Sequence, residues 1–204
     1  MDAALNLKIA NCDFEKLFAK MGYTFFTKGD YNLNIIGIRN MTTPIQRDTF
    51  NDAMVIIYKE KGNWKKEIFE ITTDPSLKFL KAPSNVNGTA ILVPGQYRST
   101  YKIDYHNGKY LALCQRLKPV KVYRDKNRDN KLDMNPATIQ TGMFGINLHH
   151  ASASYDSDTI GLYSAGCQVY HHMKDFNRMM HLANIAKNIY GNSFTYTLIT
   201  SNDL

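Results

Sequence analysis

Apolar residues recur at two different spacings along this chain, and the spacing changes near residue 50. Residues 3–21 have an approximately helical repeat of apolar positions, at Leu5, Ile9, Phe14, Leu17, Phe18 and Met21. Gly22 follows as a residue able to end such a helix. Residues 32–40, NLNIIGIRN, form a short apolar run that predicts a buried strand. We therefore expect residues 1–50 to form an N-terminal helical extension.

From residue 53 onward the pattern changes to alternation, which is typical of strands. Residues 53–60 and 64–74 flank the turn sequence KGN and predict a β-hairpin. A Pro-Gly turn at 94–95 separates two further strands within residues 89–106. A second hairpin turn, HNG, leads into KYLALCQ, and VKVYRD predicts one more strand.

The last part of the chain predicts one helix and one strand. Residues 174–190 place apolar side chains on one helical face, and Gly191 follows as a stop. SFTYTLIT then predicts a closing strand. The expected fold is mainly β, with an N-terminal helix and a C-terminal helix, and with residues 51–204 as the main domain.

The composition is that of a globular protein, with 44% hydrophobic and 21% charged residues among 204. No apolar stretch reaches the length of a membrane span, so no membrane partner is expected. The net charge of +7 favours polyanionic partners. The basic residues are dispersed and no nucleic-acid-binding motif is present, so nucleic acid is not expected. The N-terminus lacks the apolar run of a signal peptide, which predicts synthesis in the cytoplasm without an export signal.

The three cysteines are too few and too scattered for a disulfide framework. Cys114 lies within an apolar run, where packing is its expected role. Cys167 follows Ser-Ala-Gly, and shortly before it GINLHH ends in His149 and His150. A thiol nucleophile needs a base and hydrogen-bond donors for the oxyanion. Cys167 is therefore either a nucleophile with a histidine base or a small buried residue.

The spacing of these residues resembles the signature of the L,D-transpeptidase (YkuD-type) family. That signature is a histidine followed, after a spacer, by Ser/Thr-His-Gly-Cys, and here His149 precedes Ser164-Ala165-Gly166-Cys167 after fourteen residues. The segments IFEITTD and TAILVPGQY match the family in the same order. The resemblance covers roughly residues 53–170. It implies the β-sandwich or barrel of that family.

The resemblance implies a role for each residue of the motif. Cys167 is the nucleophile, His149 its base, and the backbone carbonyl of His150 orients the imidazole. The amides of Gly166 and Cys167 form the oxyanion hole in a loop that also contains Ser164 and Ala165. Ala165 replaces the family's histidine, and Gln168-Val169 replaces an aliphatic residue followed by Arg or Asn. These departures indicate a divergent branch with altered donor specificity.

The implied activity is cleavage or exchange of amide bonds in the stem peptides of peptidoglycan through an acyl-thioester. No cofactor is required. Tyr97, Tyr163 and Gln168 are candidate substrate-binding residues. The missing export signal fits a bacteriophage lysin or a virion-associated hydrolase that acts at the bacterial cell wall. The alternative is a non-catalytic binding module or virion structural module on the same fold, with Cys167 buried. The sequence does not specify an oligomeric state.

Two further groups of residues are candidate metal ligands. Asp125, Asn127, Asp129 and Asp133 occupy positions one, three, five and nine of a calcium-binding loop, although the expected glutamate is missing. The loop predicts either a structural Ca²⁺ site or a charged turn held by Asx hydrogen bonds. His171 and His172 precede the C-terminal helix. Adjacent histidines rarely share a metal ion, so zinc is not expected from them.

Overall fold

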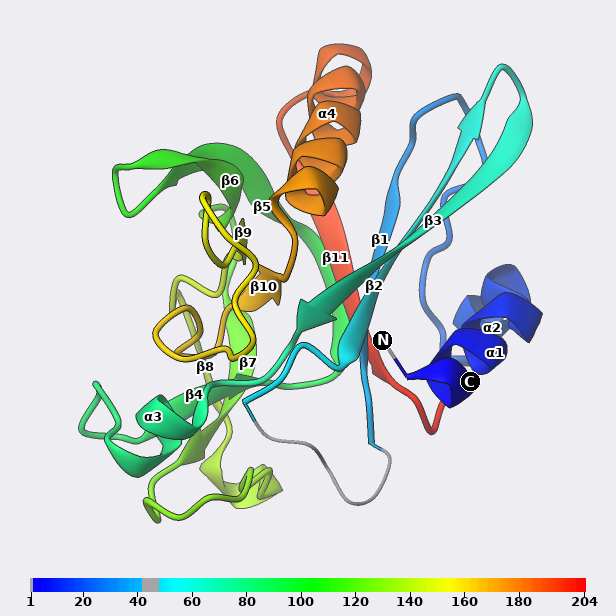
Figure 1. Cartoon of the computed structure of the whole chain (residues 1–204). Helices are drawn as coiled ribbons and strands as arrows, with labels where there is room; N and C mark the ends of the chain where they lie inside the picture. The colour runs from blue at the N-terminus through cyan, green and yellow to red at the C-terminus, as the bar shows by residue number, and fades with distance from the viewer. Residues whose placement is uncertain (1, 42–47) are drawn as a thin grey trace.

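The computed structural model describes residues 2–41 and 48–204. Eight of its strands form a closed barrel in the order β1-β11-β5-β6-β9-β10-β3-β2 (Figure 1). Their bounds are β1 Asn34–Arg39, β2 Asp52–Glu60, β3 Asn63–Thr72, β5 Gly95–His106, β6 Tyr110–Gln115, β9 Leu148–His150, β10 Gln168–Tyr170 and β11 Phe194–Thr200. The mainly β fold expected from the sequence is confirmed, as are the hairpins β2–β3 and β5–β6.

Strand β1 is an integral part of this barrel. It pairs antiparallel with β2, with Ile36 opposite Val55, and parallel with β11, with Gly37 opposite Leu198. The expected division into an extension 1–50 and a domain 51–204 is therefore corrected, because the barrel cannot close without residues 34–39. Residues 1 and 42–47 of that extension lie outside the described residues.

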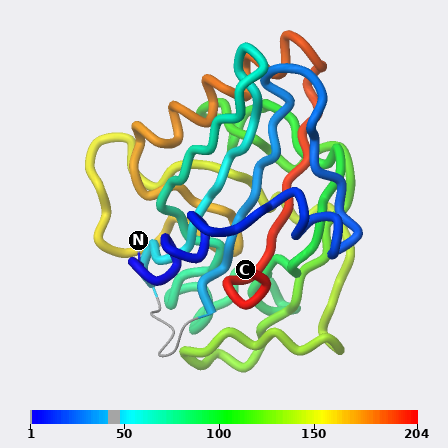
Figure 2. The backbone as a smooth tube through the Cα atoms, turned by 90° about the vertical axis from the view of Figure 1, so that its right-hand side faces the viewer, coloured from blue at the N-terminus to red at the C-terminus, as the bar shows by residue number. Residues whose placement is uncertain are grey.

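The N-terminal segment forms two helices where the sequence pattern predicted one. Helix α1 covers Ala3–Asn11 and α2 covers Phe14–Lys20. The break falls at Cys12-Asp13 because the Asp13 side chain accepts a hydrogen bond from Lys16 N–H and so caps α2. Both helices pack their apolar faces on the outside of β1 and β2, against a cluster that contains Ile36, Ile38, Val55, Ile57 and Ile199. Figure 2 shows this N-terminal segment beside the C-terminal end of the chain.

Helix α4, Met173–Tyr190, completes the core of the barrel. Its buried face includes Phe176, Met179 and Ala183, which belong to the same cluster as the inward-facing residues of the strands. Figure 1 shows α4 at the upper end of the barrel. The expected C-terminal helix is thereby confirmed. None of the helices in the described residues is both long and apolar enough to cross a membrane.

A smaller sheet lies beside the barrel and forms one wall of the candidate site. It contains β4 (Thr89–Leu92), β7 (Val120–Asp125) and β8 (Gln140–Gly142) in the order β4-β7-β8. The two strands around the Pro-Gly turn thus enter different sheets, since β4 pairs with β7 while β5 enters the barrel. Two short helical segments lie next to this sheet in the chain: α3 (Leu77–Lys81) precedes β4, and η1 (Pro136–Thr138) connects β7 to β8.

Candidate functional site

Strands β9 and β10 bring the histidine and the cysteine of the motif to the same face of the barrel. The strands are parallel, with His149 opposite Val169, and Gln168 N–H donates to Asn147 O at 2.9 Å. Side chains alternate along a strand, and Leu148 and Tyr170 belong to the core inside the barrel. His149 therefore faces outward, on the side of the sheet where Cys167 lies just before β10.

Cys167 lines a pocket of about 340 Å³ between the barrel and the smaller sheet. Asn147 N–H donates to Sγ at 3.4 Å, and the thiol donates to Gly145 O at 3.4 Å. Burial raises the pKa of the Cys167 thiol to about 11, although the Asn147 hydrogen bond opposes this shift. The residue is half-buried, and with this raised pKa it is a neutral thiol near pH 7.

Ser164 organises the loop that carries Cys167. Its hydroxyl donates to Cys167 O at 2.9 Å and accepts from Gly166 N–H at 3.2 Å. Ser164 O accepts from Ser76 N–H at 3.0 Å, which ties the loop to the segment after β3. The Gly166 amide is thus already engaged, which corrects its expected role in the oxyanion hole. Cys167 N–H has no hydrogen-bond partner within the described part of the chain, and exposed Ala165 lies at the pocket.

His149 is held by the carbonyl to which the sequence assigned this role. Its Nδ1 lies 2.8 Å from His150 O and 3.3 Å from the Tyr110 hydroxyl. With Nδ1–H donating to that carbonyl, Nε2 is the ring nitrogen able to accept a proton. Burial lowers the pKa of His149 to about 3, and neighbouring His106 contributes to the shift. No hydrogen bond joins this ring to Cys167 Sγ.

The His150 ring does not take part in the site. It packs 4.2 Å from the Tyr110 ring and 5.0 Å from the Phe176 ring, measured between centroids. Burial lowers the pKa of this imidazole. His150 therefore contributes its backbone carbonyl, while its side chain belongs to the packing between β9 and α4.

Two residues of the site escaped sequence analysis. The ring of His106 stacks on His149 with centroids 4.1 Å apart, and its Nδ1 lies 3.0 Å from Asn147 Nδ2. Asn147 also accepts from Gln115 N–H at 2.9 Å, so it links β6, the cysteine and the histidine pair. The sequence gave no indication that His106 belongs to the site, because the segment HNG predicts only a hairpin turn. Only the pairing of β6 with β9 shows that this turn lies over the site.

Arg124 places a positive charge in the same pocket. Its Nε donates to Gln140 Oε1 at 2.9 Å, its Nη1 donates to Gly88 O at 3.2 Å, and the guanidinium lies 4.6 Å from the Phe144 ring centroid. These contacts fix the side chain beside the Cys167 pocket, where it can attract an anionic group.

The predicted substrate-binding residues lie elsewhere. The Tyr97 hydroxyl donates to Val93 O at 2.5 Å. Gln168 is fully buried, and its side-chain Oε1 accepts a hydrogen bond from the Tyr196 hydroxyl at 2.8 Å. Neither lines the Cys167 pocket, because both side chains are engaged in internal hydrogen bonds, and the structure corrects both assignments. Tyr163 packs near Cys167, with its hydroxyl 3.0 Å from that of Tyr155, and also does not line the pocket.

The loop at residues 125–133 has the hydrogen bonds of a polar turn. Asp129 N–H donates to Asn127 Oδ1, Lys131 N–H to Asp129 Oδ1, and Asp133 N–H to Asp125 Oδ2. Among the described residues, the carboxylates of Asp125, Asp129 and Asp133 do not converge within 4.8 Å of one another. The geometry is that of the Asx-stabilised turn, and calcium binding stays a prediction.

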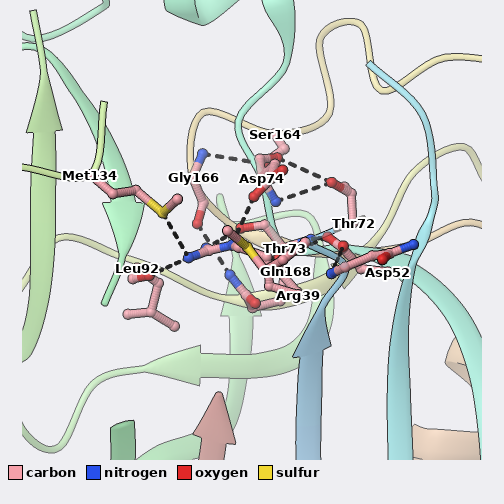
Figure 3. A network of polar contacts seen from close by, with 12 residues as sticks. Arg39, Asp52, Thr72, Thr73, Asp74, Leu92, Met134, Ser164, Gly166 and Gln168 are labelled. Atoms are coloured by element: carbon pink, nitrogen blue, oxygen red, sulfur yellow. Dashed lines mark hydrogen bonds and ion pairs between the residues drawn. The ribbon is translucent and has the colours of Figure 1, made fainter. Parts of the chain in front are cut away.

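A buried ionic network of Arg39, Asp52, Thr73 and Asp74 lies next to the loop that contains Ser164 and Gly166 (Figure 3). Arg39 Nε lies 2.9 Å from Asp74 Oδ1, and its Nη2 and Nη1 donate to Thr73 O and Leu92 O. Asp52 accepts from Thr73 N–H at 2.6 Å. Burial and the nearby Asp74 carboxylate raise the pKa of Asp52 to about 7. This network fixes the segment that continues to Ser76, the residue bonded to the cysteine loop.

The raised pKa predicts how fast Cys167 reacts with iodoacetamide. Only the thiolate is alkylated, so a thiol with a pKa of about 11 reacts slowly at pH 7, and its rate should rise about tenfold per pH unit up to pH 10. Peptide mass spectrometry would measure the rate. In the urea-unfolded chain, the alkylation rate of the same cysteine should level off above about pH 8.5, the ordinary pKa of a cysteine thiol. A rate independent of pH from 7 to 9 in the folded protein would show a preformed thiolate and contradict the expectation.

Comparisons of the chain with protein-family models, with curated proteins and with solved structures found no match. The resemblance to L,D-transpeptidases therefore depends on the motif and on the arrangement described above.

Proposed function

We propose that this protein is a cysteine-dependent acyl-transfer enzyme that acts on the stem peptides of peptidoglycan. The observation that carries the proposal is the placement of Cys167. Cys167 lines a pocket just before β10, on the face of the sheet where β9 presents His149. The L,D-transpeptidase-like spacing of these two residues supplies the substrate class.

The proposed reaction begins with both groups neutral. As Sγ attacks the substrate carbonyl carbon, the thiol proton passes to His149 Nε2, and Cys167 N–H donates to the developing oxyanion. The C–N bond then breaks, and the leaving amine takes the proton from the imidazolium. Water or a second amine resolves the thioester by hydrolysis or by transpeptidation. The proposal requires substrate binding to bring sulfur and imidazole into contact.

Arg124 supports an anionic substrate. The chain has Val169 where the resemblance expects an arginine or asparagine that binds the donor carboxylate. Arg124 provides a cation from β7 on the opposite wall of the same pocket. A guanidinium suits a carboxylate because it donates two parallel hydrogen bonds. We therefore assign recognition of a stem-peptide carboxylate to this residue.

The direct test compares the products of purified peptidoglycan incubated with the wild type and with Cys167→Ala. Mass spectrometry should detect cleaved or newly cross-linked stem peptides only with the wild type. His149→Gln should slow the reaction at least about 100-fold, the usual minimum for loss of a general base. Cys12→Ala, at a half-exposed cysteine on the other side of the barrel, is the matched control and should keep full activity. Absence of product with the wild type, or equal product with Cys167→Ala, would reject the proposal.

One observation favours a second candidate, a non-catalytic wall-binding module. The Cys167 thiol has a raised pKa and no hydrogen bond to His149, whereas many catalytic cysteines are paired with a base. Such a module would co-sediment with insoluble peptidoglycan equally well as wild type and as Cys167→Ala, and neither protein would generate products.

A further inference from the structure

His106, the last residue of β5, contacts two residues of the Cys167 site. Its ring stacks on the His149 ring with centroids 4.1 Å apart and an angle of 22° between the planes. Its Nδ1 lies 3.0 Å from the side-chain Nδ2 of Asn147, the residue whose backbone N–H donates to Cys167 Sγ. His106 is buried, and its backbone is placed by pairing with Tyr110 of β6. None of the steps of the proposed reaction uses this side chain.

Asn147 determines which nitrogen of His106 carries the hydrogen. Asn147 Oδ1 accepts from Gln115 N–H at 2.9 Å, so Nδ2 is the atom directed toward His106. An amide nitrogen only donates, and therefore His106 Nδ1 is unprotonated and accepts this hydrogen bond. The single hydrogen of the neutral ring is then on Nε2, which lies 3.1 Å from the side-chain nitrogen of Asn107. Because Asn107 is exposed in the turn, its amide can rotate to present its oxygen to this hydrogen.

The surroundings of the His106 ring disfavour a positive charge on it. A second proton, on Nδ1, would face the amide donor there. Burial, the nearby His150 ring and the positive charges of Arg116 and Lys109 lower the pKa of His106. The Tyr110 ring, 5.4 Å away between centroids, is uncharged at neutral pH because burial raises the pKa of its hydroxyl. His106 is therefore a neutral imidazole of known tautomer.

We propose that His106 is a positioning residue for His149, which it holds as a neutral stacked ring, and this role rests on the proposed function. The hydrogen bond from His149 Nδ1–H to His150 O fixes one atom of the imidazole, about which the ring could still tilt. Stacking on His106 restricts that tilt and so keeps the direction of Nε2, the nitrogen that accepts the thiol proton. Because the stacked ring is neutral, it does not repel the imidazolium that forms on His149.

Asn147 connects the two halves of this arrangement. Its backbone N–H contacts Cys167 Sγ, and its side chain sets the tautomer of the ring that orients His149. Gln115 of β6 fixes the Asn147 amide in turn. A change in that amide should therefore alter the charge of His106 without replacing Cys167 or His149.

Nitrogen-15 NMR of the histidine rings tests the neutral state of His106 and requires no substrate. The His106 signals, identified by their loss in His106→Gln, should show a neutral ring with its hydrogen on Nε2 at about pH 7.5. Asn147→Asp replaces the amide donor with a carboxylate, which accepts from Nδ1–H and favours the charged ring. The titration midpoint of His106 should therefore move to higher pH than in the wild type. A wild-type ring that is protonated, or that carries its hydrogen on Nδ1, would overturn the inference.

Reaction rates with soluble stem-peptide fragments of peptidoglycan test the positioning role. His106→Gln keeps an acceptor for the Asn147 amide but removes the ring. It should lower kcat about tenfold or more with little change in KM, because the base is misplaced while the substrate contacts remain. His106→Phe restores a neutral ring and should recover most of that loss. A merely structural role predicts the same kcat for both variants once each is folded.

The matched control is His181→Gln, at an exposed histidine on α4. It should keep the wild-type kcat, and circular dichroism would verify that every variant is folded. Equal kcat of folded His106→Gln and His181→Gln would overturn the positioning role. Absence of product with the wild type would reject the proposed function and this role together. Product formation by a wild type whose His106 carries its hydrogen on Nδ1 would reject this inference alone.

Discussion

Replacing Arg39 with methionine should lower the free energy of unfolding by about 3–5 kcal/mol, the cost of breaking a buried ion pair by removing one partner. Arg39 is 1% exposed, and its guanidinium contacts Asp74 and the carbonyls of Thr73 and Leu92. The methionine would fill much of the volume, but it would remove the guanidinium that contacts the Asp74 carboxylate and the carbonyls of Thr73 and Leu92. Urea unfolding followed by circular dichroism would measure the loss.

Arg98→Met is the matched control for this prediction. Arg98 is exposed and donates one hydrogen bond, to Thr24 at 2.6 Å, so its replacement should change stability by no more than about 0.5 kcal/mol. Adding Asp74→Asn to Arg39→Met should recover part of the loss, because the carboxylate charge that faced Arg39 is then removed as well. Equal stability of the two single variants would show that the buried network contributes nothing.

Replacing Gly166 with alanine should displace the cysteine loop and destabilise the fold by about 1–3 kcal/mol. Gly166 has φ of +124°, and a Cβ at this position would lie 2.3 Å from the backbone oxygen of Ala90. The backbone of β4 cannot move without disturbing its pairing with β7, and the loop cannot move without breaking the hydrogen bonds of Ser164. We expect a lower melting temperature and loss of the Cys167-dependent reaction.

Gly108→Ala separates the steric effect from simple backbone strain. Gly108 has φ of +71° in the β5–β6 turn, and nothing lies within 4 Å of a Cβ placed there. Its replacement should cost only about 1 kcal/mol, which is the conformational penalty alone. If Gly166→Ala were no less stable than Gly108→Ala and kept the full Cys167-dependent reaction on peptidoglycan, the close contact with Ala90 would be irrelevant.

Much of the fold could be predicted from local patterns. The hairpins, the C-terminal helix and the last strand each follow from periodicity and turn residues that act within one segment. The break in the N-terminal helix was missed because the Asp13 cap competes with an apolar repeat that continues through it. The place of β1 in the barrel was also missed. Pairing with β11 joins residues about 160 positions apart, and no local signal encodes such a contact.

The site shows the same division. The order of His149, His150 and Cys167 could be read from spacing, and parallel pairing of β9 with β10 does bring these segments together. The sequence could not indicate that Gln168 faces the barrel interior, because its direction depends on strand register. It also could not indicate that Arg124 lines the same pocket as Cys167, or that His106 stacks on His149. Arg124 belongs to β7 of the smaller sheet, and His106 is the last residue of β5 in the β5–β6 hairpin.

The position of β11 between β1 and β5 has a consequence for how the molecule is made on the ribosome. Until residues 194–200 emerge, β1 and β5 each expose an unpaired edge, and the nascent chain holds an open, curved sheet. Closing the barrel requires β11 to meet β1, about 160 residues earlier in the chain, and contacts over such separations form slowly. Chaperones that shield strand edges should therefore associate with the nascent chain before β11 emerges and dissociate once the barrel is closed.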